Sequence, residues 1–235
     1  GIVGYTTMNG DGNYWTEKDT KETGIGGHAL VMCLKTIGST GKTSMGTSYA
    51  WRSPDSDVGR TKVNSSDLIV YSYNETYGSG YTETAALMGG SAAAYWAKKY
   101  NTLPAKSSKC TGWFLPTAGQ YYAVMKTLGA PFSDDWTGIW DGYTTTHPYR
   151  GFFSNMTTVT KNINKKLKKV VDTKYYTVFF ESFNTWAWTS SECSSTNAVF
   201  IDSGVDDSKG SGSVRFNGGD FAKTYQLPVR PFLAF

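Results

Sequence analysis

Residues Gly112 to Tyr122, Gly-Trp-Phe-Leu-Pro-Thr-Ala-Gly-Gln-Tyr-Tyr, constrain the fold most, because they encode the start of a helix. The Thr117 hydroxyl can accept a hydrogen bond from the Gln120 amide, while the Gln120 side chain can reach back to the Thr117 amide. This capping box predicts a helix that begins at Thr117 and ends near Leu128, before Gly129. Its predicted apolar face comprises Tyr121, Val124, Met125 and Leu128.

An earlier helix is predicted from apolar residues at helical spacing. Positions i, i+3, i+4 and i+7 of its apolar face are Ala93, Trp96, Ala97 and Tyr100. Two consecutive glycines, Gly89 and Gly90, leave open how far this helix extends back toward Thr82.

A later helix is predicted from Val159, Ile163, Leu167 and Val170, which recur on one face. Its other face carries five lysines: Lys161, Lys165, Lys166, Lys168 and Lys169. Such a face can meet phosphates or anionic sugars. Because no aromatic residue interleaves the lysines to stack bases, we interpret it as a solvated face and expect no nucleic-acid partner.

Short apolar runs predict strands, most of them in the last third of the chain. The run from His28 to Leu34 is apolar on both faces, which is typical of a central strand. The later runs are Thr177–Phe180, Trp186–Thr189, Asn197–Asp202, Ser213–Phe216 and Val229–Phe235. Helices in the middle and strands at the end predict an α+β fold with an antiparallel sheet. No repeat or break in composition divides the chain, so we interpret residues 1–235 as a single domain.

The composition favours a loop-rich extracytoplasmic domain. Aromatic residues make up 15% of the 235 residues, and 26 glycines supply turns, while the formal net charge is only +4. No apolar run reaches the roughly 18 residues that a transmembrane helix needs. The chain begins at Gly1 without a methionine, which suggests a trimmed mature protein, and a lipid anchor could lie upstream.

Residues that could carry chemistry are few. Only two histidines occur, His28 and His147, and neither a Gly-x-Ser-x-Gly elbow nor a cofactor motif is present. Cys33 lies in an apolar run and is predicted to be buried, whereas Cys193 lies in a polar loop and is the candidate for reactivity. One disulfide among the three cysteines stays open, as does a carboxylate pair for hydrolysis.

Calcium is a further option that the sequence leaves open. Two acidic loops, Asp55-Ser56-Asp57 and Asp206-Asp207, have the oxygen ligands that calcium prefers. Neither loop fits the twelve-residue EF-hand pattern. We therefore predict no bound metal and no cofactor.

Several blocks in one order carry a resemblance to a known family. These blocks are Gly1–Val3, Gly27–Val31, Ala92–Ala97, Trp113–Thr117, Trp188–Glu192, Asn197–Ala198 and Val229–Phe235. With them the chain resembles, over residues 1–235, bacterial extracytoplasmic domains of the DUF1566 type, common among Bacteroides-like surface lipoproteins and adhesin-like proteins. Such domains are similar to a variant C-type lectin fold, shared with formylglycine-generating enzymes and with the variable proteins of diversity-generating retroelements.

The resemblance implies a C-type-lectin-like fold: two main helices packed on a twisted antiparallel sheet, with long loop insertions and adjacent chain ends. It implies that Trp188 is a core residue and that Arg230 anchors the final strand. In the retroelement branch the ligand surface lies on C-terminal loops and strands. The implied ligand-binding face comprises Trp186, Glu192, Ser194, Ser195, Asn197, Phe216, Asn217, Phe221 and Tyr225.

Three functions are consistent with these observations. The first is a non-catalytic recognition or adhesion domain on a bacterial surface, which binds a glycan or a protein. The second is an enzyme, either a hydrolase or a divergent relative of the formylglycine-forming oxidases. The oxidase branch requires two cysteines close in sequence, and only Cys193 lies in the C-terminal half of this chain. The third is a structural subunit of a surface fibre without a ligand of its own.

Overall fold

The computed structural model describes residues 2–6, 29–37, 48–54, 56, 58, 80–100, 110–118, 120, 121, 124, 128, 150–153, 156–170, 185–206, 211–217 and 222–235. Its helices are α2 (Gly80–Leu87), α3 (Ala92–Lys99) and α5 (Met156–Val170). Its strands are β1 (Ile2–Thr6), β2 (Ala29–Met32), β3 (Tyr49–Ala50), β4 (Arg150–Phe153), β5 (Thr185–Glu192), β6 (Ala198–Asp206), β7 (Ser211–Asn217), β8 (Gln226–Leu227) and β9 (Phe232–Ala234).

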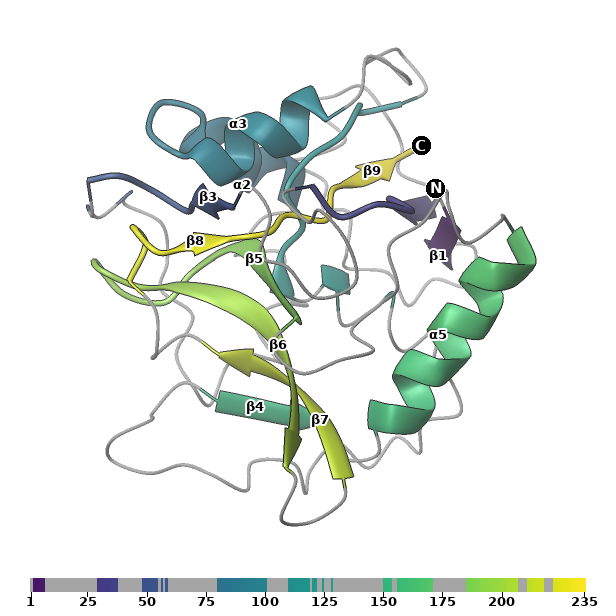
Figure 1. The fold of residues 1–235 in the computed structure, drawn as a ribbon. Coiled ribbons are helices and arrows are strands. Elements are labelled where there is room, and N and C mark those ends of the chain that lie inside the picture. Colours follow the sequence, from purple (N-terminus) through teal and green to yellow (C-terminus); the bar gives the residue numbers. More distant parts are fainter. Residues whose placement is uncertain are drawn as a thin grey trace.

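The two ends of the chain share one sheet. Strand β2 lies between β1 and β9, pairs with both in antiparallel fashion, and is buried along its whole length. The Ala29 amide donates to the Phe235 carbonyl at 2.9 Å, so the last residue is fixed against the start of β2. Figure 1 marks both chain ends near this sheet, in which β2 separates β1 from β9. The prediction of a central strand from His28 to Leu34 is confirmed for its described part.

The larger sheet holds four antiparallel strands in the order β4-β7-β6-β5 (Figure 1). Helix α2 packs against β5, and α5 packs against β7. Trp188 in β5 is fully buried and meets Phe200 of β6 edge to face at 5.9 Å, so its predicted core position is confirmed. The α+β prediction is confirmed as well, while the C-type-lectin detail and the single domain stay predictions. The predicted strand Thr177–Phe180 lies outside the described residues.

The predicted capping box is present, and it joins two helices. The Gln120 amide donates to the Thr117 hydroxyl, and the Thr117 amide donates to Gln120 Oε1, both at 3.1 Å. The same Gln120 oxygen accepts the amide of Gly80, the first residue of α2, also at 3.1 Å. A Cβ at Gly80 would lie 2.7 Å from the Pro116 Cα, so only glycine fits this close approach. The first residue of α2 is therefore fixed directly to the capped helix start at Thr117.

The alanine-rich helix α3 differs from its prediction in one important respect. Gly89 and Gly90 form a turn that separates α2 from α3, and the Ser91 hydroxyl caps α3 by accepting the Ala94 amide at 3.0 Å. The buried side chains of α3 are Ala93, Ala94 and Ala97. The assignment of Trp96 to the buried face is wrong, because small alanines allow close packing on the core whereas the large ring faces outward.

Candidate functional site

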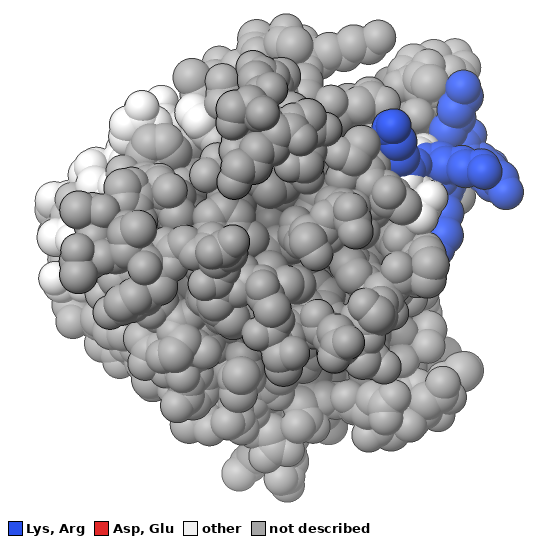
Figure 2. Space-filling view, turned by 90° about the horizontal axis from the view of Figure 1, so that it is seen from below, with Lys and Arg blue, Asp and Glu red and all other residues white. Residues whose placement is uncertain are grey.

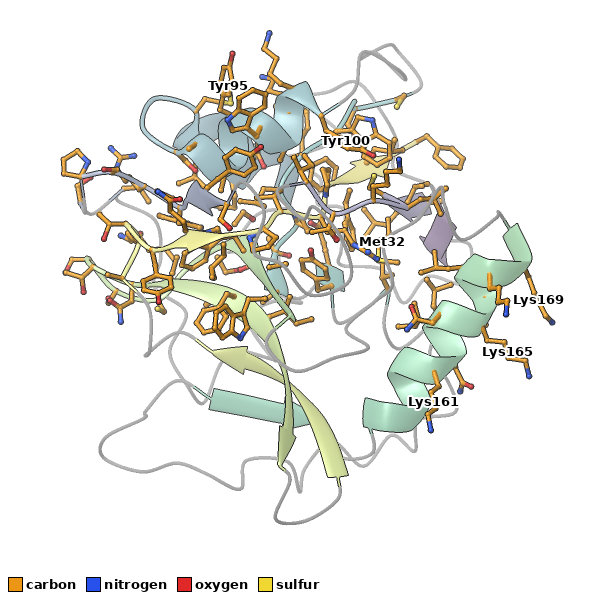
Figure 3. All side chains as sticks on the ribbon, in the orientation of Figure 1. Met32, Tyr95, Tyr100, Lys161, Lys165 and Lys169 are labelled. Atoms are coloured by element: carbon orange, nitrogen blue, oxygen red, sulfur yellow. The ribbon has the colours of Figure 1, made fainter. Side chains whose placement is uncertain are left out.

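An aromatic patch, formed by the exposed Tyr95 and Trp96 and the half-buried Tyr49, lies where α3 meets β3. Tyr95 is 41% exposed and Trp96 is 43% exposed. The Tyr49 and Trp96 rings stack, with centroids 5.5 Å apart and an interplanar angle of 28°. Tyr95 stands nearly perpendicular to Trp96, at 5.5 Å and 88°. Figure 3 shows Tyr95 on the outer side of α3, directed away from the core.

The frame beneath the aromatic patch is fixed on both sides. The alanine face of α3 belongs to a buried cluster, called here the main core cluster, against which Tyr49 also packs. Its members are Trp51, Leu87, Ala93, Ala94, Ala97, Leu115, Trp188, Ala198, Phe200, Leu227 and Val229. Strand β3 pairs with β8, so that Tyr49 lies opposite Leu227. The Trp188 indole donates to the Tyr49 carbonyl at 2.8 Å and ties β3 to β5. The Tyr49 phenol is protonated at neutral pH and can donate a hydrogen bond, and burial raises its pKa further above the ordinary value of 10.

Part of the sequence-predicted ligand face comes together at a second place. Ser194, Ser195 and Asn197 lie in the connection from β5 to β6, and the Asn197 backbone forms a bridge with Ala222. Tyr225 lies three residues after Ala222 in the sequence, and its side chain is 46% exposed. Ser195 is exposed too, but the Ser194 hydroxyl accepts the Asn197 amide at 2.8 Å, which holds the turn closed.

The remaining predicted residues do not extend that face. Trp186 is half-buried and packs against the main core cluster from the other end of β5. Phe216 and Asn217 lie in β7, where their backbones pair with both β4 and β6. Phe221 and the side chains of Phe216 and Asn217 lie outside the described part of the structure.

Glu192 requires a correction, because its side chain is buried and forms an ion pair with the equally buried Lys223. The Lys223 ammonium also donates to the Ser195 carbonyl at 2.7 Å and to the Ser56 carbonyl at 2.8 Å. It lies 5.1 Å from the Trp51 ring centroid, within cation–π range. The Glu192 carboxylate therefore holds the protein interior together and is not part of an exposed ligand face.

Lys223, the buried cation at the centre of these contacts, was not identified by the sequence analysis. A lysine in a polar segment is normally exposed, and no local pattern marks this one as buried. Its amide donates to the Thr196 carbonyl at 2.8 Å, and its carbonyl accepts the Arg52 amide at 3.0 Å. Lys223 thus joins its own segment to two others that are distant in sequence, around Arg52 and around Thr196.

The cysteines are all free, buried thiols, which excludes the disulfide that the sequence left open. The prediction that Cys33 is buried is confirmed. Cys193 is only 3% exposed, and burial raises its pKa from 9.0 to about 12 against the lowering effect of Lys223. Since the thiolate is the nucleophile, the expected reactivity of Cys193 is not supported.

Arg230 occupies the position that the resemblance implies for it. It is buried beside β2, where its Nε donates to the Thr36 hydroxyl at 2.9 Å. Its carbonyl accepts the Tyr121 hydroxyl at 3.2 Å, which links the capped helix to the segment that leads into β9. Burial lowers the Arg230 pKa and raises the Tyr121 pKa.

No metal-binding cluster is present in the described ranges, where no group of three His, Cys, Asp or Glu side chains could hold a metal ion. Both histidines and Asp55 and Asp57 of the first acidic loop lie outside those ranges. Over the same ranges, no helix combines the length and the apolar character that a membrane crossing requires.

Neither a protein-family model nor a curated protein matches this sequence. Among solved structures, the chain is similar to a fimbrial protein from Bacteroides ovatus ATCC 8483, with 17% identity and a TM-score of 0.49. The similarity covers 92% of this chain and 37% of the fimbrial protein, so the chain spans little more than a third of that protein's length.

Proposed function

We propose that this domain is a non-catalytic recognition module that binds a glycan at the aromatic patch. The observation that carries the proposal is the stack of the half-buried Tyr49 ring on the exposed Trp96 ring, with exposed Tyr95 perpendicular beside it. Trp and Tyr rings present a large apolar surface together with a polar group, which suits a sugar ring that has one apolar face and several hydroxyls. Because the rings sit on a fixed frame, little side-chain freedom is lost on binding.

The resemblance to DUF1566-type domains supports a place for this module on a bacterial cell surface, as part of an adhesin or a lipoprotein. The aromatic patch lies on α3 and β3, and none of its three residues belongs to the C-terminal face that the resemblance implies. An adhesion role requires only a ligand, whereas a fibre subunit requires none. Binding experiments therefore distinguish the two.

The test is a glycan array followed by calorimetry on the best ligand, with Trp96→Ala as the main variant. We expect Trp96→Ala to weaken binding at least about tenfold, as loss of an interface aromatic anchor does. Phe235→Ala is the matched control, because Phe235 is also an exposed aromatic residue, at 44%. It should bind like the wild type.

Tyr225→Ala tests the C-terminal face against the aromatic patch. If Tyr225→Ala abolishes binding while Trp96→Ala retains it, the ligand site lies at the turn beside Ser195 and the aromatic-patch proposal fails. If no glycan binds the wild-type domain, the recognition proposal fails and the fibre-subunit alternative gains. Thermal melts of each variant establish that the fold is intact.

A further inference from the structure

Helix α5 carries a row of exposed cations. The lysine row, defined as Lys161, Lys165 and Lys169, occupies successive turns on one side of the helix, and Figure 3 shows all three side chains directed outward. Successive members are four residues apart, so they are spaced by about 6 Å along the axis. Lys166 and Lys168 are exposed as well.

The net positive charge of the chain comes from this helix. Residues Met156–Val170 contain five lysines and no acidic residue. The whole chain has a formal net charge of +4, so all other residues together carry a formal charge of −1. Among the residues that Figure 2 colours, the lysines form one blue group, and no acidic side chain is visible on that face.

A purely solvated helix face normally mixes both signs, because pairs of opposite charge at i, i+4 stabilise it. Here Lys161 repels Lys165, and Lys165 repels Lys169. The helix is held instead by its apolar face, where Ile163 and Leu167 are fully buried. Lysines in the last turn favour the helix dipole, but Lys161 and Lys165 lie before that turn. Within the described residues, the packing of α5 therefore rests on Ile163 and Leu167 and not on the lysine row.

We propose that the lysine row is a binding site for a linear anionic polysaccharide, independent of the aromatic patch. Lysines are point charges on flexible stems, so they suit a chain of repeated carboxylates or sulfates. The exposed face of α5 holds no aromatic residue to stack on bases and no arginine to pair with phosphates, which disfavours nucleic acid. Its described apolar side chains, Ile163 and Leu167, are already buried in the protein, which disfavours insertion of α5 into a membrane as an amphipathic helix.

The experiment measures binding of the whole domain to heparin and to polygalacturonate, with neutral dextran of similar length as the reference. The test variant is Lys161→Gln/Lys165→Gln. The control is Lys98→Gln/Lys99→Gln, which removes the same charge from exposed positions at the end of α3. We expect the wild type and the control to bind at least one anionic chain, and the test variant to bind at least about tenfold more weakly. Wild-type affinity should also fall about tenfold between roughly 50 and 200 mM NaCl.

Three results would overturn the proposal. The first is no binding to either anionic chain, and the second is an equal loss in the test and control variants. The third is tighter binding to a DNA duplex or to anionic vesicles than to the polysaccharides. A urea titration separates binding from folding, because loss of like-charge repulsion should leave the test variant at least as stable as the wild type. A fall in its stability would assign the lysines a structural role.

Discussion

The buried ion pair between Lys223 and Glu192 makes a sharp prediction about stability. Replacing Lys223 with Met removes the ammonium that pairs with Glu192, bonds two backbone carbonyls and lies over the Trp51 ring. Breaking one side of a buried pair costs about 3–5 kcal/mol, because the remaining charge is left in a medium of low polarity. With a urea dependence of about 2 kcal/mol/M, the unfolding midpoint should fall by about 1.5–2.5 M.

A second substitution, Glu192→Gln, tests whether an unpaired buried charge causes the loss of stability, because its effect on the free energy of unfolding should change sign between two backgrounds. Glu192→Gln should destabilise the wild type, because it leaves the Lys223 ammonium without its anion. In the Lys223→Met background the same change should stabilise the protein, since it removes the stranded carboxylate. The double-mutant cycle should therefore give a coupling energy of at least about 3 kcal/mol, because the cost in the wild type and the gain in the Lys223→Met background add.

Urea unfolding followed by tryptophan fluorescence measures all four proteins, and Lys98→Met is the control. Lys98 is exposed on α3, so its loss should change the free energy of unfolding by less than about 0.5 kcal/mol. The reasoning is refuted if Lys223→Met costs less than about 1 kcal/mol, as exposed pairs do. It is refuted as well if Glu192→Gln has the same effect in both backgrounds.

Three further predictions follow from buried groups. Because burial raises the folded pKa of Cys193 to about 12, stability should be full below pH 9 and fall by up to about 1.4 kcal/mol per unit above it. Cys193→Ala should make that fall smaller in urea titrations at pH 8 and pH 10.5, while the buried Cys33, whose pKa is also raised, keeps its own contribution; an unchanged fall would contradict the assignment. Gln120→Ala should cost more than Thr117→Ala, about 2–4 against about 1 kcal/mol, since Gln120 serves two amides. Gly80→Ala should lower the melting temperature by several degrees, about 4 °C or more, and a neutral result would show that the chain can relax there.

Much of the fold was predictable because its signals are local. The Thr117 and Gln120 box needs only a spacing of three residues, and both of its hydrogen bonds are present. The run from His28 to Leu34 predicts a strand buried on both faces, and β2 lies between two neighbours. The buried Ile163 and Leu167 follow in the same way from the period of a helix.

The candidate site was less predictable, because exposure depends on neighbours that are distant in sequence. Helical spacing places Ala93, Trp96 and Ala97 close together around the helix, but it cannot say which side of that group meets the core. In the structure the alanines meet it, because Ala93, Ala94 and Ala97 are buried in the same core cluster as Trp51 and Trp188. Trp96 is therefore exposed and stacks with Tyr49, a residue that no local pattern connects to it.

The sequence alone determined the α+β class, the capped helix, the lysine face of α5 and the late antiparallel strands. Only the tertiary structure decided that Glu192 is buried with Lys223, that Cys193 is buried and that Tyr95 and Trp96 are exposed side by side on α3. The physical reason is the range of the interactions. Hydrogen bonds and periodicity within one element act over a few residues, whereas burial is fixed by segments that meet only after the chain has folded.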